Sequence, residues 1–333
     1  MEDPNLLDYT NLIMTLFDQF IKTEPEVMRY HDLCTYKDRE LIIFFMLMQF
    51  RRISEFKAQA RWLKAHREMR SFLKMKTTPH RTTLSRRYKK LADVLEAFVA
   101  FVGGEEADLD EAFSNRHLIQ DKSLFKASGP VWHQSDRQAG RIPPKLRRLD
   151  TDASWGKSGY QGWVYGYGLH LTCTEAAFPK MLQVETATVA DSTVLDEKAE
   201  FILNKLQPAS LCADDRYTKA MRIRRWIGQG TLLITPALRW LEGRYAKAYH
   251  QFLAQPDVIE RLKRRKTSVE PLFDSVAKVL GTSTRQKELP VQKLVNVRTA
   301  LALATFSVQI AMVMNSIRGL PLRRIAAIKA AFS

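Results

Sequence analysis

The spacing of apolar residues changes once along the chain, near residue 146, and this change limits the fold more than any other feature. From Tyr9 to about Val102, apolar residues recur at the spacing of helices. From Leu146 onward, short apolar runs typical of strands alternate with helical segments. A chain of 333 residues is long enough for two cores, perhaps three. We therefore expect a helical N-terminal part followed by a mixed sheet with helices on its faces.

The charge of the chain indicates a polyanionic partner. The formal net charge is +16. Nucleic acid is the commonest partner of so basic a chain, an anionic membrane surface is the weaker candidate, and a merely basic protein is the alternative. The apolar stretches Leu41–Phe50 and Ala300–Met314 are short or interrupted by polar residues, so we interpret both as buried helices. Neither membrane nor small-molecule binding is expected.

The cysteines indicate a reducing compartment. Cys34, Cys173 and Cys212 lie far apart and lack the spacing of metal ligands. We expect buried thiols in a cytoplasmic protein.

A helix-turn-helix pattern is expected near the end of the helical part. Pro79 interrupts the chain, and Thr82 or Thr83 is a suitable cap for a following helix. The first turns of this helix are basic and its later turns are apolar, which suits a helix that enters the major groove. A solvated basic face on an ordinary bundle helix is the alternative. The sequence thus predicts a helical DNA-binding domain over residues 1–102 and a connecting region over 103–145.

Five strands are expected in the region 146–333. They are separated by short turns at first and then by helices, and their approximate bounds are Arg147–Ser154, Trp163–Cys173, Met181–Thr186, Ser210–Asp214 and Leu232–Thr235. Helices are expected over Asp191–Leu203, Tyr217–Ile227 and Val295–Ile317. Three successive strands followed by alternating helices and strands match a ribonuclease H-like fold.

Three acids in this region are candidates for catalysis with divalent metal ions. Asp152 and Asp214 lie near predicted strand ends, and Glu270 lies on a predicted helix. Carboxylates are the ligands that Mg²⁺ prefers, and two ions can clamp the attacking and leaving oxygens of a phosphodiester. Each acid has competitors among its neighbours, which are Asp150, Asp215, Glu260 and Asp274.

The motifs around these acids resemble a DDE transposase of a bacterial insertion sequence, from about Arg147 to Lys278. Asp152-Ala153-Ser154 is similar to the first motif of that family, and GYQGWVYGYGLHL resembles its glycine-rich second strand. Asp191-Ser192 also matches, and Asp214 precedes Tyr217 by three residues, as the second catalytic aspartate does in the family. The resemblance implies that Asp152, Asp214 and Glu270 are catalytic and bind the metal ions.

The third motif of the family, Tyr-x2-Arg-x3-Glu-x6-Lys, is less complete here. If Glu270 is its acid, Lys263 replaces the tyrosine, Lys266 replaces the arginine, and Lys278 lies one residue beyond the lysine position. Basic residues before Glu270 and on the expected DNA-reading helix suit contacts with phosphates, although a solvated helix face is the alternative. The predicted DNA-binding residues are Arg81, Arg86, Arg87, Lys89, Lys90, Lys263, Arg264, Arg265, Lys266 and Lys278.

The resemblance implies a transposase that binds the terminal inverted repeats of its element and catalyses metal-dependent DNA cleavage and strand transfer. It implies Mg²⁺ or Mn²⁺ as cofactor, with two ions per site, and double-stranded DNA of the element ends and the target as partner. A homodimer on DNA and association with a bacterial nucleoid are further expectations. The alternatives are a DNA-binding protein that has lost catalysis and a nuclease of the same fold without strand transfer.

Aromatic residues near the first motif have two interpretations. Trp155, Tyr160, Trp163 and Tyr165 can stack on unpaired bases or can pack within the sheet. His170, on the same predicted strand as Trp163, is expected to be structural.

Overall fold

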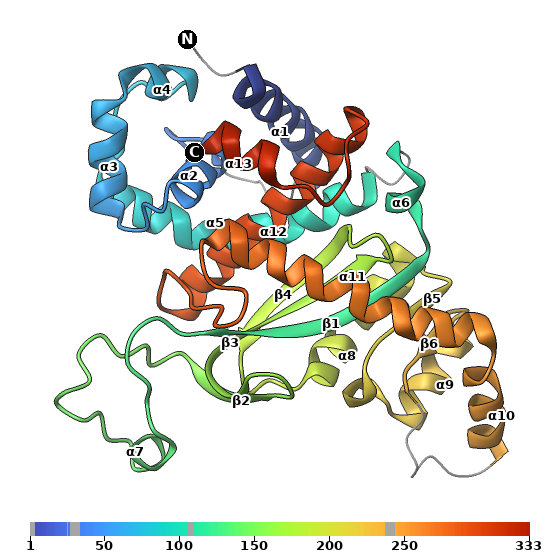
Figure 1. Ribbon diagram of the computed structural model, residues 1–333. Helices are drawn as coiled ribbons and strands as arrows, with labels where there is room; N and C mark the ends of the chain where they lie inside the picture. The colour runs from blue at the N-terminus through green and yellow to red at the C-terminus, as the bar shows by residue number, and fades with distance from the viewer. Residues whose placement is uncertain (1–3, 25, 27–33, 106–108, 237–243) are drawn as a thin grey trace.

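The computed structural model contains one mixed sheet with helices on both of its faces (Figure 1). It describes residues 4–24, 26, 34–105, 109–236 and 244–333. The predicted fold class is confirmed, because several helices precede a mixed sheet whose strand order is consistent with a ribonuclease H-like fold.

The sheet is built around one long strand. Its six strands are β1 (His117–Lys126), β2 (Ser154–Ser158), β3 (Gly162–Thr174), β4 (Pro179–Thr186), β5 (Ser210–Cys212) and β6 (Leu232–Ile234). Strand β1 pairs antiparallel with β3 on one side and parallel with β5 on the other. Both β2 and β4 pair antiparallel with β3, and β6 pairs parallel with β5. Strand β1 is therefore central, with side chains that reach both neighbours.

The first strand of the chain is not where the sequence predicted it. The prediction of a strand over Arg147–Ser154 was wrong, because β2 begins only at Ser154 and turns precede it. The backbone of Arg148 is left-handed, with φ of 64°, and this conformation interrupts an extended strand. The first strand is β1, which lies within residues 103–145 that were expected to connect two domains. The other four strands were predicted to within about two residues.

Helices cover the sheet on both sides. In Figure 1, α11 and α12 lie above the sheet and α8 lies below it. The helices after β1 are α7 (Gln134–Gln138), α8 (Asp191–Phe201), α9 (Ala220–Gly228), α10 (Arg244–Leu253), α11 (Pro256–Leu280), α12 (Leu294–Ile317) and α13 (Ala326–Phe332). A π-helical turn, η3 (Ile202–Leu206), extends α8, and a 3-10 turn, η4 (Asp215–Tyr217), follows β5. Helix α11 thus crosses the face of the sheet next to β1 and β5.

The N-terminal helices share a hydrophobic core with the sheet. They are α1 (Pro4–Thr23), α2 (Asp38–Phe50), α3 (Phe56–Ala65), α4 (Arg67–Phe72), α5 (Arg81–Glu105) and the short α6 (Glu111–Ser114). The second half of α5 packs against α12 and β4, and the rings of Phe98 and Phe306 lie 4.8 Å apart. The apolar side chains of both parts form one continuous cluster. Which residues fold independently stays a prediction.

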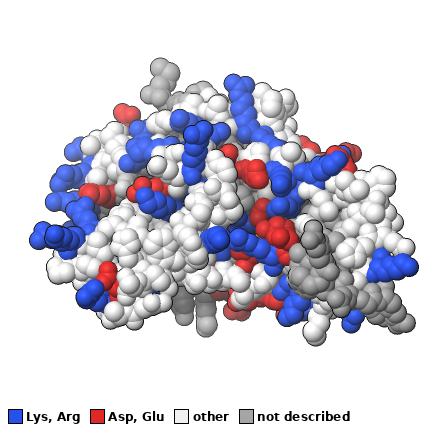
Figure 2. All heavy atoms as spheres, turned by 60° about the horizontal axis from the view of Figure 1, so that its bottom comes forward, with Lys and Arg blue, Asp and Glu red and all other residues white. Residues whose placement is uncertain are grey.

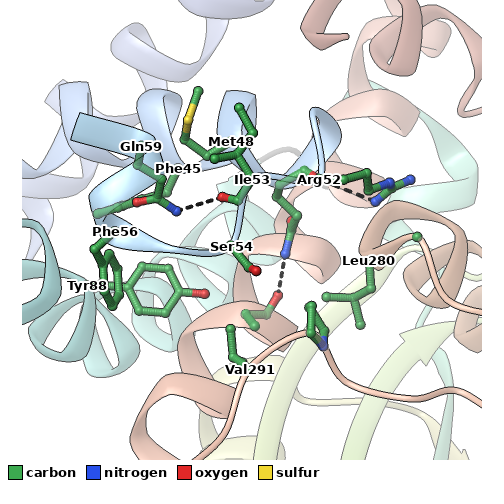
Figure 3. A pocket seen from close by; sticks show the side chains of 14 residues that line it. Phe45, Met48, Arg52, Ile53, Ser54, Phe56, Gln59, Tyr88, Leu280 and Val291 are labelled. Atoms are coloured by element: carbon green, nitrogen blue, oxygen red, sulfur yellow. Dashed lines mark hydrogen bonds between the residues drawn. The ribbon is translucent and has the colours of Figure 1, made fainter. Parts of the chain in front are cut away.

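A pocket of about 280 Å³ marks the junction between the N-terminal helices and the end of α11. Figure 3 shows the aromatic rings of Phe56 and Tyr88 on one side of it and Leu280 and Val291 on the other. Arg52, in the turn after α2, has a left-handed backbone with φ of 62°. Its guanidinium donates to the carbonyl oxygens of Lys278, at 3.0 Å, and of Val279. These contacts tie the N-terminal helices to the end of the helix that carries Glu270.

Helix α12 is the central helix of the core. By length and composition alone it is apolar enough to cross a membrane, with a mean hydropathy of 1.6. In the structure, 89% of its apolar window is buried inside the molecule. The prediction of a buried helix in this region is confirmed.

Candidate active site

Six carboxylates line a cavity of about 680 Å³ between β1, the end of β5, α8 and α11. They are Asp121, Asp191, Asp214, Asp215, Glu270 and Asp274. The face of the molecule shown in Figure 2 has a group of acidic side chains right of its centre, with basic side chains around it. Lysines and arginines also line the cavity, namely Lys122, Lys157, Arg216, Arg285 and Lys287. We call this cavity the acid pocket.

Asp121 lies in the middle of β1, on the central strand of the sheet. Its carboxylate is paired with the guanidinium of Arg265 from α11 at 2.6 Å. Burial raises the pKa of Asp121 to about 7, and the nearby carboxylates of Asp214 and Asp191 also raise it, against the lowering effect of Arg265. The ion pair with Arg265 therefore does not offset the effect of burial on the pKa of this carboxyl.

Asp214 lies beside Asp121 because their strands run parallel. Ile119 of β1 is in register with Cys212 of β5, so two further residues along each strand bring Asp121 and Asp214 to the same level. The carboxylate of Asp214 accepts the backbone N–H of Arg216 at 3.0 Å and so caps the 3-10 turn η4. Burial and the charge of Asp191 raise the pKa of Asp214.

Glu270 reaches the acid pocket from α11, which crosses the sheet next to these strands. Asp274 lies one turn later on the same helix and pairs with Lys287 at 3.7 Å. The Lys287 ammonium also donates to the hydroxyl of Ser123 on β1 at 2.9 Å. Burial lowers the pKa of Lys287, while Asp274 and Glu270 oppose that shift. Lys287 thus provides a positive charge at the wall of the pocket.

A buried ion pair holds the base of the acid pocket in place. The ammonium of Lys122 pairs with Asp191 at 3.1 Å and donates to the carbonyl oxygens of Ala187 and Val189. The Lys122 side chain has room to pass because Gly168, on β3, has no side chain. A Cβ atom at Gly168 would collide with Cε of Lys122, so the end of the lysine side chain would have to shift. The glycine-rich pattern of β3 therefore has a packing reason in this fold.

The structure brings Asp214 and Glu270 together but not Asp152. Asp152 lies in the bend before β2, where its carboxylate pairs with Lys293 at 3.3 Å and accepts the backbone N–H of Leu294 at 3.1 Å. Its competitor Asp150 is fully buried and accepts hydrogen bonds from the hydroxyl of Tyr167 and the N–H of Lys293. Neither of these two acids lines the acid pocket. Both hold the start of α12 against the sheet.

The competitors of the other two acids are placed differently. Asp215 and Asp274 line the acid pocket together with Asp214 and Glu270. Glu260 instead pairs with Arg264 at 3.2 Å, one turn away on α11. Glu270 and Asp274, the alternatives for the third candidate acid, thus line the same pocket.

The predicted DNA-binding residues of α5 are mostly exposed. The side chains of Arg81, Arg86, Lys89 and Lys90 are exposed, whereas Arg87 is half-buried and pairs with Asp38. The first half of α5 therefore presents basic side chains, while its second half is buried.

The predicted DNA-binding residues of α11 divide in the same way. Lys263, Arg264, Lys266 and Lys278 are exposed. Arg265 points instead to the carboxylate of Asp121 and belongs to the acid pocket.

The types of ligand in the acid pocket fit a hard divalent cation. Asp121, Asp214 and Glu270 offer carboxylate oxygens from three elements around one cavity, and burial and mutual repulsion raise the pKa of the first two. Among the residues that the structure describes, no three His, Cys, Asp or Glu side chains are already close enough to hold an ion. The carboxylate of Asp121 is instead paired with Arg265.

Sequence reasoning missed Asp121 because the residue after it is a lysine. The motif of an aspartate followed by a small residue and Ser or Thr is met at Asp152, whereas Asp121-Lys122-Ser123 departs from it. One signal was present, since apolar pairs flank this triplet on both sides, Leu118-Ile119 and Leu124-Phe125. These pairs are buried in β1.

Comparison with protein families gives one match. The family model described as the transposase DDE domain matches residues 113–304, a range that begins just before β1 and ends within α12. This range contains all six carboxylates of the acid pocket. No curated protein and no solved structure matches the chain.

Proposed function

Because the chain belongs to the family of the transposase DDE domain, we propose that it is a DNA transposase and that the acid pocket cuts and joins DNA strands. The observation that carries this proposal is the convergence of Asp121, Asp214 and Glu270 on one cavity. Two of these acids come from adjacent parallel strands and the third comes from a helix that crosses them. Asp121 takes the place that the sequence assigned to Asp152.

Members of this family generally use divalent metal ions. We propose that Asp121, Asp214 and Glu270 hold two such ions, Mg²⁺ or Mn²⁺. When bound, such ions would supply activation of the attacking oxygen and stabilisation of the leaving oxygen. The type of the three side chains and their shared cavity support this assignment.

Basic side chains of the acid pocket position the DNA strand. Lys287 and Arg216 present positive charge to a phosphodiester that enters the pocket, and both are themselves anchored, Lys287 on Ser123 and Arg216 on Asp191. Anchored cations orient a phosphate without losing much side-chain freedom on binding. The reaction then needs water for the first cut and a 3′-hydroxyl of the cut end for joining. The chain itself forms no covalent bond to the DNA in this scheme.

The first half of α5 reads the ends of the element. Its exposed side chains of Arg86, Lys89 and Lys90 follow a helical pair, α3 and α4, as in a helix-turn-helix. Terminal inverted repeats are the DNA that a transposase must recognise, and two ends must meet for joining. We therefore propose a homodimer on DNA, with target DNA as the second partner.

A cleavage and joining assay tests this proposal. The substrate is a labelled fragment from the DNA that flanks the gene, carrying one inverted repeat, together with a plasmid target and Mg²⁺ or Mn²⁺. We expect the wild type to nick the labelled end and to join it to the plasmid. Asp214→Asn and Glu270→Gln are expected to bind the fragment but to do neither, and Glu260→Gln is the matched control on α11 because Glu260 pairs with Arg264 outside the pocket.

Two other outcomes would contradict the proposal in different ways. Nicking without joined products would indicate a nuclease of this fold. Binding without any nicking would indicate a DNA-binding protein that has lost catalysis, and the pairing of Asp121 with Arg265 would then be its structural cause.

A further inference from the structure

The pocket of about 280 Å³ between the N-terminal helices and the end of α11 shares no residue with the acid pocket. We call it the junction pocket. Its walls come from α2, α3, α5, the end of α11, the segment before α12 and α12 itself. Apolar cavities of about 150 Å³ in proteins already hold benzene. The junction pocket therefore has room for a molecule of one or two rings.

The lining of the junction pocket suits a flat apolar molecule. On one side, the rings of Phe45 and Phe56 pack edge-on against the ring of Tyr88, with ring centres 4.9 Å and 5.5 Å away. On the other side lie the aliphatic side chains of Leu280 and Val291 (Figure 3). Small-molecule sites in proteins are commonly lined by aromatic and aliphatic side chains with a few placed polar groups.

The hydroxyl of Tyr88 is the polar group that is placed in this pocket. The Tyr88 side chain is only 7% exposed, and Figure 3 shows its hydroxyl pointing into the pocket, toward the side of Ser54. Among the residues that the structure describes, this hydroxyl has no hydrogen-bond partner. Buried tyrosine hydroxyls usually have one. Burial raises the pKa of Tyr88, so the hydroxyl keeps its proton and can donate as well as accept.

The walls around this hydroxyl are fixed by hydrogen bonds. The backbone carbonyl of Tyr88 accepts the hydroxyl of Thr299 at 2.8 Å. The side-chain amide of Gln49 donates to the carbonyl of Ala300 at 3.0 Å, and that of Gln59 donates to the carbonyl of Ile53 at 2.9 Å. A preformed site loses little conformational freedom when a ligand binds.

The charges around the junction pocket favour a neutral ligand. No described carboxylate lines it, so a cation would find no counter-ion. Its one charged lining residue in the described part of the chain is Arg52. The guanidinium of Arg52 donates to the carbonyls of Gln49 at 3.2 Å, of Lys278 at 3.0 Å and of Val279. An anion would have to compete with these three carbonyls.

We propose that the junction pocket binds a small neutral aromatic molecule, of the class of phenols and indoles. Its ring would lie between the aromatic and the aliphatic walls, and its hydroxyl or N–H group would form a hydrogen bond with the hydroxyl of Tyr88. This inference does not rest on the proposed function. Such a ligand contacts both the turn at Arg52 and the end of α11 at Leu280, so it stabilises the junction between them.

Calorimetric titration with phenol tests the proposal on the full chain, without DNA or metal. Toluene is the matched probe, because it has the same shape but no hydroxyl. For ligands of this size we expect dissociation constants of about 0.1–1 mM. Tyr88→Phe keeps the ring and removes the hydroxyl. It is expected to weaken the binding of phenol by about three- to tenfold and to leave the binding of toluene no weaker than in the wild type.

Two further variants accompany the titration. Tyr36→Phe removes a tyrosine hydroxyl outside the pocket, where it bonds to the hydroxyl of Thr77 at 2.8 Å, and is expected to bind both probes as the wild type does. Val291→Trp places a large ring in the pocket and is expected to bind neither probe. Circular dichroism and urea unfolding show whether Val291→Trp is folded.

Hydrogen exchange gives a second readout of the same binding. Phenol is expected to slow the exchange of backbone amides around Arg52 and Gly281 in the wild type, since both residues line the pocket. Amides of α9, which contributes no residue to the pocket, should exchange at an unchanged rate.

Three results would overturn the inference. The first is the absence of binding of phenol to the wild type at concentrations up to about 5 mM. The second is equal binding of phenol to Tyr88→Phe and to the wild type. The third is binding of phenol to folded Val291→Trp, which would place the site elsewhere. If Val291→Trp does not fold, Tyr88→Phe decides, because it leaves the volume of the pocket unchanged. The proposed function is tested separately, since no titration here uses DNA or metal.

Discussion

At the scale of single residues, His170 shows how the centre of the sheet constrains a titratable group. The imidazole is buried in β3, and neither ring nitrogen has a hydrogen-bond partner in the structure. Burial, together with the charge of Lys122, lowers the pKa of His170 to about 3. The ring is therefore neutral in the folded protein, in accord with the structural role expected from the sequence.

This lowered pKa predicts a pH-dependent stability. Above about pH 6.5, the pKa of the imidazole in the unfolded state, His170 is neutral in both the folded and the unfolded protein. It then contributes nothing to the pH dependence of the free energy of unfolding. Below this pH, the unfolded state takes up a proton that the folded state refuses until about pH 3, so the free energy of unfolding falls by about 1.4 kcal/mol per pH unit. The free energy of unfolding is measured with urea between about pH 7.5 and pH 5.5. Its slope against pH should be smaller in His170→Gln than in the wild type, by the equivalent of up to one proton. His250→Gln is the control, because the side chain of His250 is exposed on α10. An unchanged slope in His170→Gln would contradict the account.

The sequence predicted some acids of the acid pocket but not others. Asp214 was predicted to lie in the site from its place after an apolar strand and from the resemblance at Tyr217, and Glu270 was predicted from its helix. The structure places both in the acid pocket. Asp121 was not predicted, since a lysine follows it, and the end of that lysine side chain passes Gly168 on another strand. This contact joins residues that lie far apart in the sequence, so the local sequence does not show it.

At the scale of elements, α11 links the acid pocket to the rest of the molecule. It supplies Glu270 and Arg265 to the pocket and ends at Gly281, whose backbone is left-handed with φ of 74°. The last carbonyls of a helix lack partners within the helix. The guanidinium of Arg52 donates one hydrogen bond to the carbonyl of Lys278 and one to the carbonyl of Val279.

Removal of this cap is expected to loosen α11. Arg52→Ala should lower the free energy of unfolding by about 1–3 kcal/mol, because the hydrogen bonds of its guanidinium to the carbonyls of Lys278, Val279 and Gln49 are lost. The variant should also cut DNA more slowly than the wild type, since Glu270 lies on the same helix. Urea unfolding and the cleavage assay measure the two effects. Lys57→Ala, exposed on α3, is the control for a lost positive charge near the junction. Equal stability of the wild type and Arg52→Ala would show that the cap is dispensable.

Strand β1 was harder to locate than the helices for a physical reason. The buried helix α12 has a long apolar pattern that identifies it from the sequence. Strand β1 instead carries Gln120, Asp121 and Lys122 in succession, since two neighbouring strands and the pocket accept polar side chains there. Its pattern therefore resembled a loop. The segment before β2 was predicted to be a strand with Asp152 near its end as a metal ligand, but Asp152 lies in a turn and binds Lys293 and Leu294 instead.

At the scale of the whole molecule, one core unites the helices that present basic side chains with the sheet that carries the acids. The mixed fold was predictable from the change of apolar spacing near residue 146. The continuity of the core was not, because it depends on contacts between α5 and α12, which lie far apart in the sequence. Cations are exposed on α5 and α11, and the net charge is +16, so we propose that a DNA duplex contacts both helices.

This charge predicts a steep salt dependence of duplex binding. A plot of log affinity against log salt concentration should have a negative slope of about 0.9 per phosphate contact. The triple variant Arg86→Ala/Lys89→Ala/Lys90→Ala is expected to reduce that slope by up to about three while leaving stability unchanged. Arg87→Ala should instead lower stability, because Arg87 pairs with Asp38. Fluorescence anisotropy with a labelled duplex gives the slopes. A triple variant with the wild-type slope would remove α5 from the DNA interface.

The central claim is that Asp121, and not Asp152, is the first acid of the catalytic site. The most direct test compares Asp121→Asn with Asp152→Asn in cleavage of a labelled element end with Mg²⁺, at equal binding of the fragment. Asp121 lines the acid pocket and Asp152 binds Lys293 outside it. The account predicts that Asp121→Asn binds but does not cut, with a loss of at least about a thousandfold, and that Asp152→Asn cuts within about tenfold of the wild type. Cleavage by Asp121→Asn at the wild-type rate, with an inactive Asp152→Asn, would contradict it.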